Sequence, residues 1–239
     1  MKALLLDLDD TLLINDMDVF APHYFKALLA KVRKICPPQL FLESLEAATR
    51  AVWLNDGQDG TNAEVFRQEF FPRLGRSPEE LMPLFEEFYA RDFEALRRHT
   101  AIDPDARVLV ELAFERGHPV AIATQPIFPL SAILARLRWA GVGAEKFHYD
   151  FIASYETMSA CKPHPHYFAT ILERLGRAPG ECLMVGDSPD SDMAAGKLGL
   201  KTFWVHRGRA PTLSAVSCDA QGSLRDLITL IETGGVDEL

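Results

Sequence analysis

The sequence lacks the features that mark membrane proteins and nucleic-acid-binding proteins. It has no uncharged apolar stretch near the ~18 residues that a membrane-spanning helix requires. The apolar run Ala3–Leu6 is too short for a signal peptide and is followed at once by Asp7. Long blocks of lysine and arginine are absent and the formal net charge is −9, which disfavours nucleic acid or an anionic membrane as the main partner. We therefore expect a cytoplasmic protein that binds neither nucleic acid nor a membrane.

Cysteine is also scarce, with four residues spread along the chain and no CxxC spacing. This pattern argues against a disulfide framework and a cysteine-based zinc site, and it indicates reduced thiols. The 239 residues are 48% hydrophobic and 25% charged, which is the composition of an ordinary globular protein. That length suits one large α/β domain, or one domain that carries an insertion.

What the sequence does contain is a succession of short β-type runs and helical segments. The β-type runs cover residues 2–7, 119–124, 149–154, 182–187 and 201–206. Each run lacks the apolar/polar alternation of a half-exposed strand, so both of its faces are expected to be buried. Helical periodicity that ends at a glycine marks residues 103–117, 129–141 and 164–176. Strands alternating with helices predict a doubly wound α/β core with a parallel sheet.

One long interval interrupts this alternation. Residues 15–101 have helical periodicity almost throughout. Within this interval, Ser77, Pro78 and Glu80 form the start signal of a helix over residues 77–99. We therefore expect a core made of residues 1–14 and 102–239, with an all-helical domain inserted at residues 15–101.

The stretch "ALLLDLDDTLLIN" places Asp7, Asp9 and Asp10 directly after the first β-type run. Two carboxylates ~4 Å apart repel each other by about 4 kcal/mol at an effective dielectric constant near 20. Such a cluster therefore calls for a cation. Hard oxygen ligands without histidine or cysteine suit Mg²⁺, which usually binds substrate phosphate as well.

Polar residues also follow the later β-type runs, and the carboxyl ends of parallel strands meet at one edge of an open α/β sheet. The side chains that we expect there are Thr124, Gln125, Lys162, Asp187 and Asp192. Lys162 and Thr124 supply an ammonium and a hydroxyl that suit a phosphoryl group. Asp7 is suited to attack phosphorus, and Asp9 to protonate the departing alkoxide and later take a proton from water.

The motifs "DLDDT", Thr124, Lys162 with Pro163, and "GDSPDSD" resemble, in order and rough spacing, the four motifs of the haloacid dehalogenase-like (HAD) hydrolase superfamily. The resemblance implies a Rossmann-like core with a mobile helical cap domain inserted after the first motif. It also implies Mg²⁺-dependent phosphoryl transfer, with Asp7 as the nucleophile and Asp9 as the acid/base.

The resemblance also implies a set of ligand residues. Asp7, Asp187 and the backbone carbonyl of Asp9 match the positions that bind the metal, and Asp192 matches a second acid that supports the waters of the metal. Position 125 departs from the pattern, because many relatives carry asparagine where this chain has Gln125. We expect the longer amide of Gln125 to reach a phosphate oxygen or a cap residue.

Several functions remain open for such a chain. The leading hypothesis is hydrolysis of a small phosphomonoester through an aspartyl-phosphate on Asp7, by a monomer or weak dimer. A phosphomutase or a haloacid dehalogenase on the same fold is an alternative, although Asp9 suits an oxygen leaving group. A phospho-aspartate switch is a non-enzymatic alternative, but it has no place for the helical insertion. The segment 53–62, rich in glycine and aspartate, either reaches over the site or is an ordinary surface loop.

Overall fold

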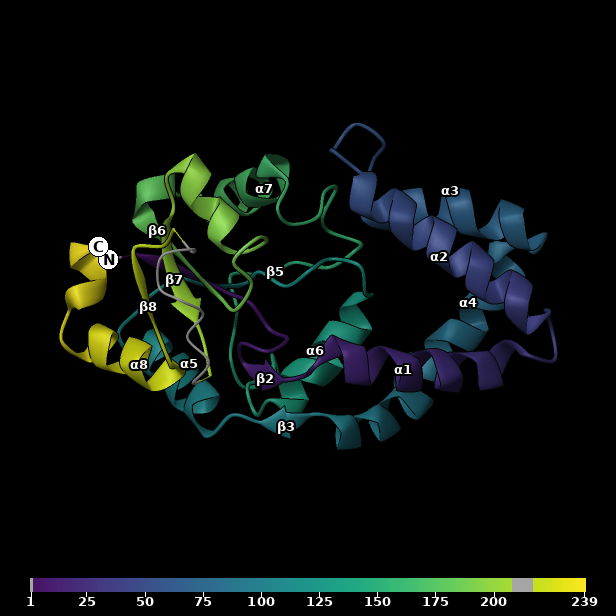
Figure 1. Ribbon diagram of the computed structural model, residues 1–239, viewed down its shortest axis with the longest axis horizontal. Helices are drawn as coiled ribbons and strands as arrows, with labels where there is room; N and C mark the ends of the chain where they lie inside the picture. Colours follow the sequence, from purple (N-terminus) through teal and green to yellow (C-terminus); the bar gives the residue numbers. More distant parts are fainter. Residues whose placement is uncertain (1, 208–216) are drawn as a thin grey trace.

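The computed structural model describes residues 2–207 and 217–239. Its centre is a parallel sheet with the strand order β5-β4-β1-β6-β7-β8. These strands are β1 (Ala3–Leu6), β4 (Val120–Ile122), β5 (Phe151–Ile152), β6 (Cys182–Gly186), β7 (Lys201–Val205) and β8 (Ala220–Gly222). In Figure 1 the sheet occupies the left half of the molecule. Because the chain winds outward from β1 in both directions, the structure confirms the predicted doubly wound α/β core.

Helices cover both faces of the sheet. One face packs against α5 (Pro104–Glu115), α6 (Leu130–Trp139) and α8 (Leu224–Glu232), and the other against α7 (Pro165–Leu175) and the 3₁₀ helix η4 (Met193–Leu198). Alternate residues of β1 divide between them: Leu4 and Leu6 point to the first face, and Ala3 and Leu5 to the second. Burial on both faces explains why the strand sequences are apolar without alternation.

The chain between β2 (Leu13–Ile14) and β3 (Ala101–Ile102) is helical, as the sequence predicts. It contains α1 (Met17–Val32), α2 (Pro38–Leu54), α3 (Asn62–Leu74), α4 (Pro78–Glu87), the π-helical segment η1 (Phe88–Asp92) and the 3₁₀ helix η2 (Phe93–His99). We call this part, residues 17–99, the helical insertion. It extends to the right of the sheet in Figure 1. Strands β2 and β3 pair in antiparallel fashion, so the chain enters and leaves the insertion at neighbouring positions.

The expected single helix over residues 77–99 is divided into three segments. It starts at Ser77 with the predicted capping box, turns π-helical at Phe88 and becomes a 3₁₀ helix at Phe93. In a regular α-helix two residues five positions apart point in different directions. The wider π-turn brings Phe88 and Phe93 to the same side, where both are fully buried with ring centroids 6.1 Å apart.

The longest helices of the insertion bury only one side. In α1 the buried residues include Phe20 and Tyr24, and in α2 they include Phe41 and Val52. These helices have 16 and 17 residues. No helix within the described ranges is long and apolar enough to cross a lipid bilayer.

Candidate active site

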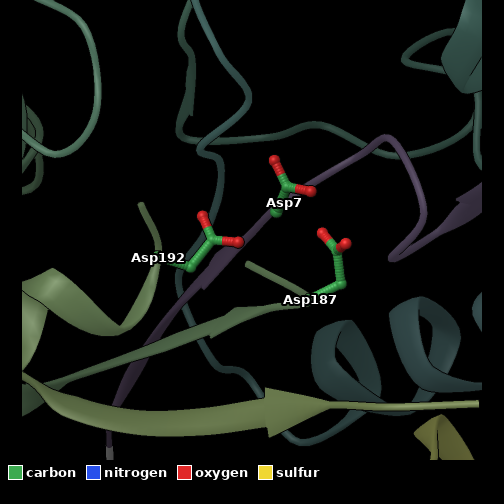
Figure 2. A group of neighbouring side chains, drawn as sticks. All are labelled: Asp7, Asp187 and Asp192. Atoms are coloured by element: carbon green, nitrogen blue, oxygen red, sulfur yellow. The ribbon is translucent and has the colours of Figure 1, made fainter. Parts of the chain in front are cut away.

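Charged side chains from several strand ends meet at the carboxyl edge of the sheet. Asp7 follows β1 and Asp187 follows β6, and these two strands are direct neighbours. One carboxylate oxygen each from Asp7, Asp187 and Asp192 lies within 4.8 Å of the other two. Figure 2 shows the three carboxyl groups around one small space. Together with Lys162, these residues form what we call the strand-end cluster.

A glycine at the end of β6 makes room for this arrangement. A Cβ atom on Gly186 would lie 2.2 Å from Oδ2 of Asp192, so a side chain at this position would displace that carboxylate. The same Oδ2 accepts a hydrogen bond from the backbone N–H of Ser188 (3.0 Å). The indole N–H of Trp204 on β7 donates to the backbone carbonyl of Asp187 (2.8 Å). These contacts curl the loop after β6 back over the strand end.

Lys162 joins the cluster as a buried ammonium. Its Nζ lies 2.7 Å from Oδ1 of Asp7 and 2.6 Å from Oδ1 of Asp192, and the residue is only 3% exposed. Burial lowers the pKa of Lys162, but Asp192 and Asp7 outweigh this effect and raise it well above its usual value. Lys162 therefore keeps its positive charge at any pH at which the protein would be studied.

The surroundings of Asp187 favour its neutral form, whereas those of Lys162 favour the charged form. Burial, followed by the nearby charges of Asp192 and Asp10, raises the pKa of Asp187 to about 7. The side chain of Thr11 offers one compensating contact, from Oγ1 to Oδ1 of Asp187 at 3.5 Å. One ammonium faces three carboxyl groups, so a further cation would balance the cluster when all three are ionised.

The donor set suits Mg²⁺. The groups that face one another are carboxylate oxygens from Asp7, Asp187 and Asp192, without histidine or cysteine among them. Hard oxygen ligands of this kind select Mg²⁺ over softer metals. The side chain of Asp9 points elsewhere, so any part it plays in metal binding is limited to its backbone carbonyl.

The Asp9 carboxylate is held by two side chains outside the cluster. The amide Nδ2 of Asn15 donates to Oδ1 of Asp9 (2.6 Å). Arg136 on α6 forms an ion pair with the other oxygen. Arg136 is fully buried, and its guanidinium lies over the ring of Phe128 with Cζ 4.5 Å from the centroid. A paired guanidinium of this kind orients the carboxylate of Asp9 and keeps it from rotating.

Sequence reasoning missed Arg136. A helical signal was available, because Arg136 lies four residues from both Ala132 and Ala140, which are fully buried. A charged residue on the apolar side of a helix requires a partner of opposite charge. Asp9 is that partner.

Thr124 and Gln125 lie next to the cluster in different roles. Thr124 is buried just beyond β4, where its carbonyl accepts a hydrogen bond from the Tyr167 hydroxyl (2.8 Å). Gln125 bonds the backbone of Lys162 twice: Oε1 accepts from its N–H (2.9 Å) and Nε2 donates to its carbonyl (3.1 Å). Gln125 therefore positions Lys162, and its expected contact with phosphate stays a prediction.

The segment 53–62 is exposed over most of its length and is anchored to the core at its end. Asn62 at the start of α3 is fully buried and donates from Nδ2 to the carbonyls of Pro126 (3.1 Å) and Ala160 (3.3 Å). Its backbone N–H donates to the carbonyl of Met158 (2.7 Å). The helical insertion is thus attached to the core by hydrogen bonds as well as by its two strands.

Comparison with known families identifies the class of protein. Residues 1–199 match the family described as haloacid dehalogenase-like hydrolase. The chain belongs to this family. The match confirms the resemblance carried by the four motifs and the expected enzyme class, a HAD-like hydrolase.

Particular relatives agree with this assignment. The chain is 30% identical over 254 residues to a phosphoserine phosphatase of Thermus thermophilus, with 95% of this chain and 98% of that protein covered. It is 27% identical over 220 residues to a phosphoglycolate phosphatase of Pectobacterium atrosepticum, with 89% and 85% covered. The solved 2-haloacid dehalogenase of Pseudomonas syringae pv. Tomato DC3000 has a TM-score of 0.64 at 21% identity, covering 98% of this chain and 99% of that one. That structural likeness supports the fold.

Proposed function

We propose that this protein is a Mg²⁺-dependent phosphatase that hydrolyses a small phosphomonoester through an aspartyl-phosphate on Asp7. The observation that carries the proposal is the meeting of three carboxylates and one ammonium at the ends of neighbouring strands. Stability gives no reason to gather these groups, since burying like charges costs free energy. Phosphoryl transfer does give one, because it depends mainly on positioning and on charge stabilisation.

The first step forms a bond between a carboxylate oxygen of Asp7 and phosphorus while the bond from phosphorus to the leaving oxygen breaks. One Asp7 oxygen accepts from Lys162, which orients the carboxylate for this attack. Lys162 and Thr124 bind oxygens of the phosphoryl group. Mg²⁺ held by Asp7 and Asp187, with Asp192 behind it, would neutralise negative charge on the phosphoryl oxygens.

Asp9 handles the protons in both steps. Each of its oxygens accepts one contact, from Asn15 or Arg136, and keeps a second lone pair for a proton. Asp9 gives that proton to the leaving oxygen, which departs as an alcohol. It then takes a proton from the water that attacks phosphorus, which releases phosphate and restores the Asp7 carboxylate.

The relatives support the class of substrate. Two of them are named as phosphatases, one for phosphoserine and one for phosphoglycolate. The phosphoric monoester is common to both, whereas the alcohol part differs. We therefore propose a phosphoric monoester hydrolase whose leaving group is a small molecule.

The arrangement of the chain carries further proposals. We propose that the helical insertion, together with the residues that flank it, forms a cap domain with bounds at residues 15 and 101. We also propose a cytoplasmic protein that works as a monomer or weak dimer. Size-exclusion chromatography with light scattering tests the oligomeric state.

The deciding experiment is hydrolysis of p-nitrophenyl phosphate with and without Mg²⁺ by the native protein and by Asp7→Asn. The variant keeps the size of the side chain and removes the nucleophilic charge, and we expect it to lose at least about 10⁴-fold in kcat. Asp190→Asn is the matched control, since Asp190 belongs to the same "GDSPDSD" stretch and is exposed outside the cluster. Unchanged turnover in Asp7→Asn would show that the nucleophile is misassigned.

The same assay separates the alternatives. A haloacid dehalogenase would release halide from a 2-haloacid without a divalent metal. A phosphomutase would return phosphate to a second position of its substrate rather than to water. A phospho-aspartate switch would accumulate phosphorylated protein with little turnover.

A further inference from the structure

A cavity of about 510 Å³ lies between the helical insertion and the core. Its wall is mainly aromatic, and the rings that line it include Tyr24, Phe41, Phe66, Phe70, Phe128 and Tyr155. These residues come from α1, α2, α3 and two loops of the core. A volume of this size accommodates a drug-sized molecule. We call this space the aromatic cavity.

Two residues of the cavity wall contact the side chains that hold the acid/base Asp9. Phe128 lines the cavity and carries on its ring the guanidinium of Arg136, which is paired with Asp9. Met17 also lines the cavity, and its sulfur accepts a contact from Nδ2 of Asn15 (3.7 Å), the same nitrogen that donates to Asp9. The cavity therefore lies one contact away from both partners of the residue that protonates the leaving group.

The charges of the cavity wall are few and lie at its mouth. The charged residues that line the cavity are Arg67, Glu86 and Glu156, and all three are exposed. Two carboxylates outnumber one guanidinium there. The buried Arg136 pairs with Asp9 through Nη1 and does not line the cavity, although its Nη2 has no hydrogen-bond partner among the described residues. A leaving group with a carboxylate would thus meet an apolar wall and a mouth with more negative than positive charges.

We infer that the aromatic cavity binds the leaving group of the substrate, and that this leaving group is an uncharged alkyl or aryl alcohol. The inference rests on the proposed phosphatase function and specifies its substrate class. The phosphoryl group lies at the strand-end cluster, the ester oxygen faces Asp9, and the apolar remainder extends into the cavity. Removing that remainder from water is the source of substrate affinity.

A series of n-alkyl phosphates tests the inference. Each methylene that enters the cavity is expected to raise kcat/KM by up to about fourfold, so hexyl phosphate exceeds ethyl phosphate by up to about 200-fold. O-phosphoserine, with its charged leaving group, is expected to react more slowly than butyl phosphate. A flat or falling series overturns the inference while the phosphatase function stands, and so does a preference for O-phosphoserine over hexyl phosphate.

A pair of variants locates the effect in the cavity. Ala21→Phe places a ring in the wall of the cavity on α1 and is expected to lower the ratio of hexyl to ethyl phosphate kcat/KM at least about tenfold. Ala30→Phe adds the same ring at an exposed position of the same helix and is expected to leave the ratio unchanged. Because each ratio is formed within one protein, a partial loss of folded material cancels. Thr49→Leu, on α2 across the cavity, is the second variant if Ala21→Phe does not fold.

Failure of the proposed function has a separate signature. If no phosphate ester is hydrolysed, calorimetric titration with n-hexanol still measures the cavity. If hexanol binds the native protein and binds Ala21→Phe more weakly, the cavity assignment is supported and only the phosphatase proposal is contradicted. Absence of hexanol binding overturns the inference.

Discussion

The strand-end cluster and the aromatic cavity are built from opposite kinds of side chain. The cluster gathers buried charges on short loops after strands, within a few ångströms of one another. The cavity gathers aromatic rings on long helices and carries its charges only at the mouth. Charges placed rigidly suit a reaction that is the same for every ester, whereas an apolar wall selects by size and polarity. The two halves therefore divide the work between reaction and recognition.

Among the variants that compare the two halves, the largest effect is expected from Lys162→Met, which removes the ammonium of the strand-end cluster. Asp7 and Asp192 would then face each other without compensation, and we expect kcat/KM to fall about 10³-fold. The loss should be equal for ethyl and hexyl phosphate, because the cluster acts on the phosphoryl group alone. Lys197→Met, at an exposed position of η4, is the control. A loss that grows with chain length would contradict the division between the two halves.

A smaller and more selective effect is expected from Arg136→Met, which changes a residue that contacts both Asp9 and the cavity-lining Phe128. Without its guanidinium, Asp9 loses the partner that orients it, and proton donation to the leaving oxygen slows. We expect about a 10²-fold loss of kcat/KM, which reports formation of the aspartyl-phosphate, with an alkyl phosphate and little loss with 2,4-dinitrophenyl phosphate, whose leaving group needs no proton. Asp9→Asn should give the same pattern, and Arg138→Met, exposed on the same helix, should give neither. Equal losses on both esters would point to a purely structural role for Arg136.

Gln125→Leu is expected to cost about tenfold in kcat/KM by loosening the backbone that carries Lys162. Inhibition by inorganic phosphate distinguishes this positioning role from direct phosphate binding. If Gln125 only positions Lys162, the inhibition constant should weaken no more than kcat/KM does. A much larger weakening for phosphate would instead support the contact expected from the sequence.

The smallest effect concerns stability and pH. With its pKa at about 7, Asp187 stays protonated in the folded metal-free protein up to that pH, whereas in the unfolded chain it releases its proton near about pH 4. The free energy of unfolding of the metal-free protein should therefore decrease as pH rises from about 4 to about 7. Added Mg²⁺ should raise the melting temperature by a few degrees at pH 8 and less at pH 5, because it favours the ionised carboxylate. Asp187→Asn should weaken both dependences, which differential scanning calorimetry measures. Part of each should remain, because burial also raises the pKa of Asp7.

The strand-end half of the site was accessible from the sequence because Asp7 and Asp187 each come directly after a recognisable apolar run. Asp7 and Asp187 could be placed at one sheet edge without knowing any angle between elements, since parallel strands align their carboxyl ends. The structure places both there with Lys162 between Asp7 and Asp192. Sequence patterns could not reveal that Gln125 would turn toward the Lys162 backbone, because that depends on side-chain conformation.

The aromatic cavity could not be predicted from the sequence in this way. Phe41 and Phe70 have the spacing of ordinary buried helix residues, and the sequence does not distinguish a ring that fills a core from one that lines a cavity. The change from α- to π-helix at Phe88 was missed for a related reason, since it depends on packing against the other helices. The orientation of the helices relative to one another decides both whether a ring lines a cavity and where the π-turn forms. Sequence periodicity carries no information about that orientation.

The ladder between β2 and β3 has a consequence for how this molecule can be inherited and engineered. Leu13 pairs with Ile102 and Ile14 with Ala101, so the two ends of the helical insertion meet side by side. A tight turn joining Ile14 to Ala101 would close the core chain without altering the strand order of the sheet. Seen in this way, the helical insertion is an exchangeable module. Replacing it would rebuild most of the wall of the aromatic cavity and leave the strand-end cluster intact, because every residue of that cluster lies outside residues 17–99.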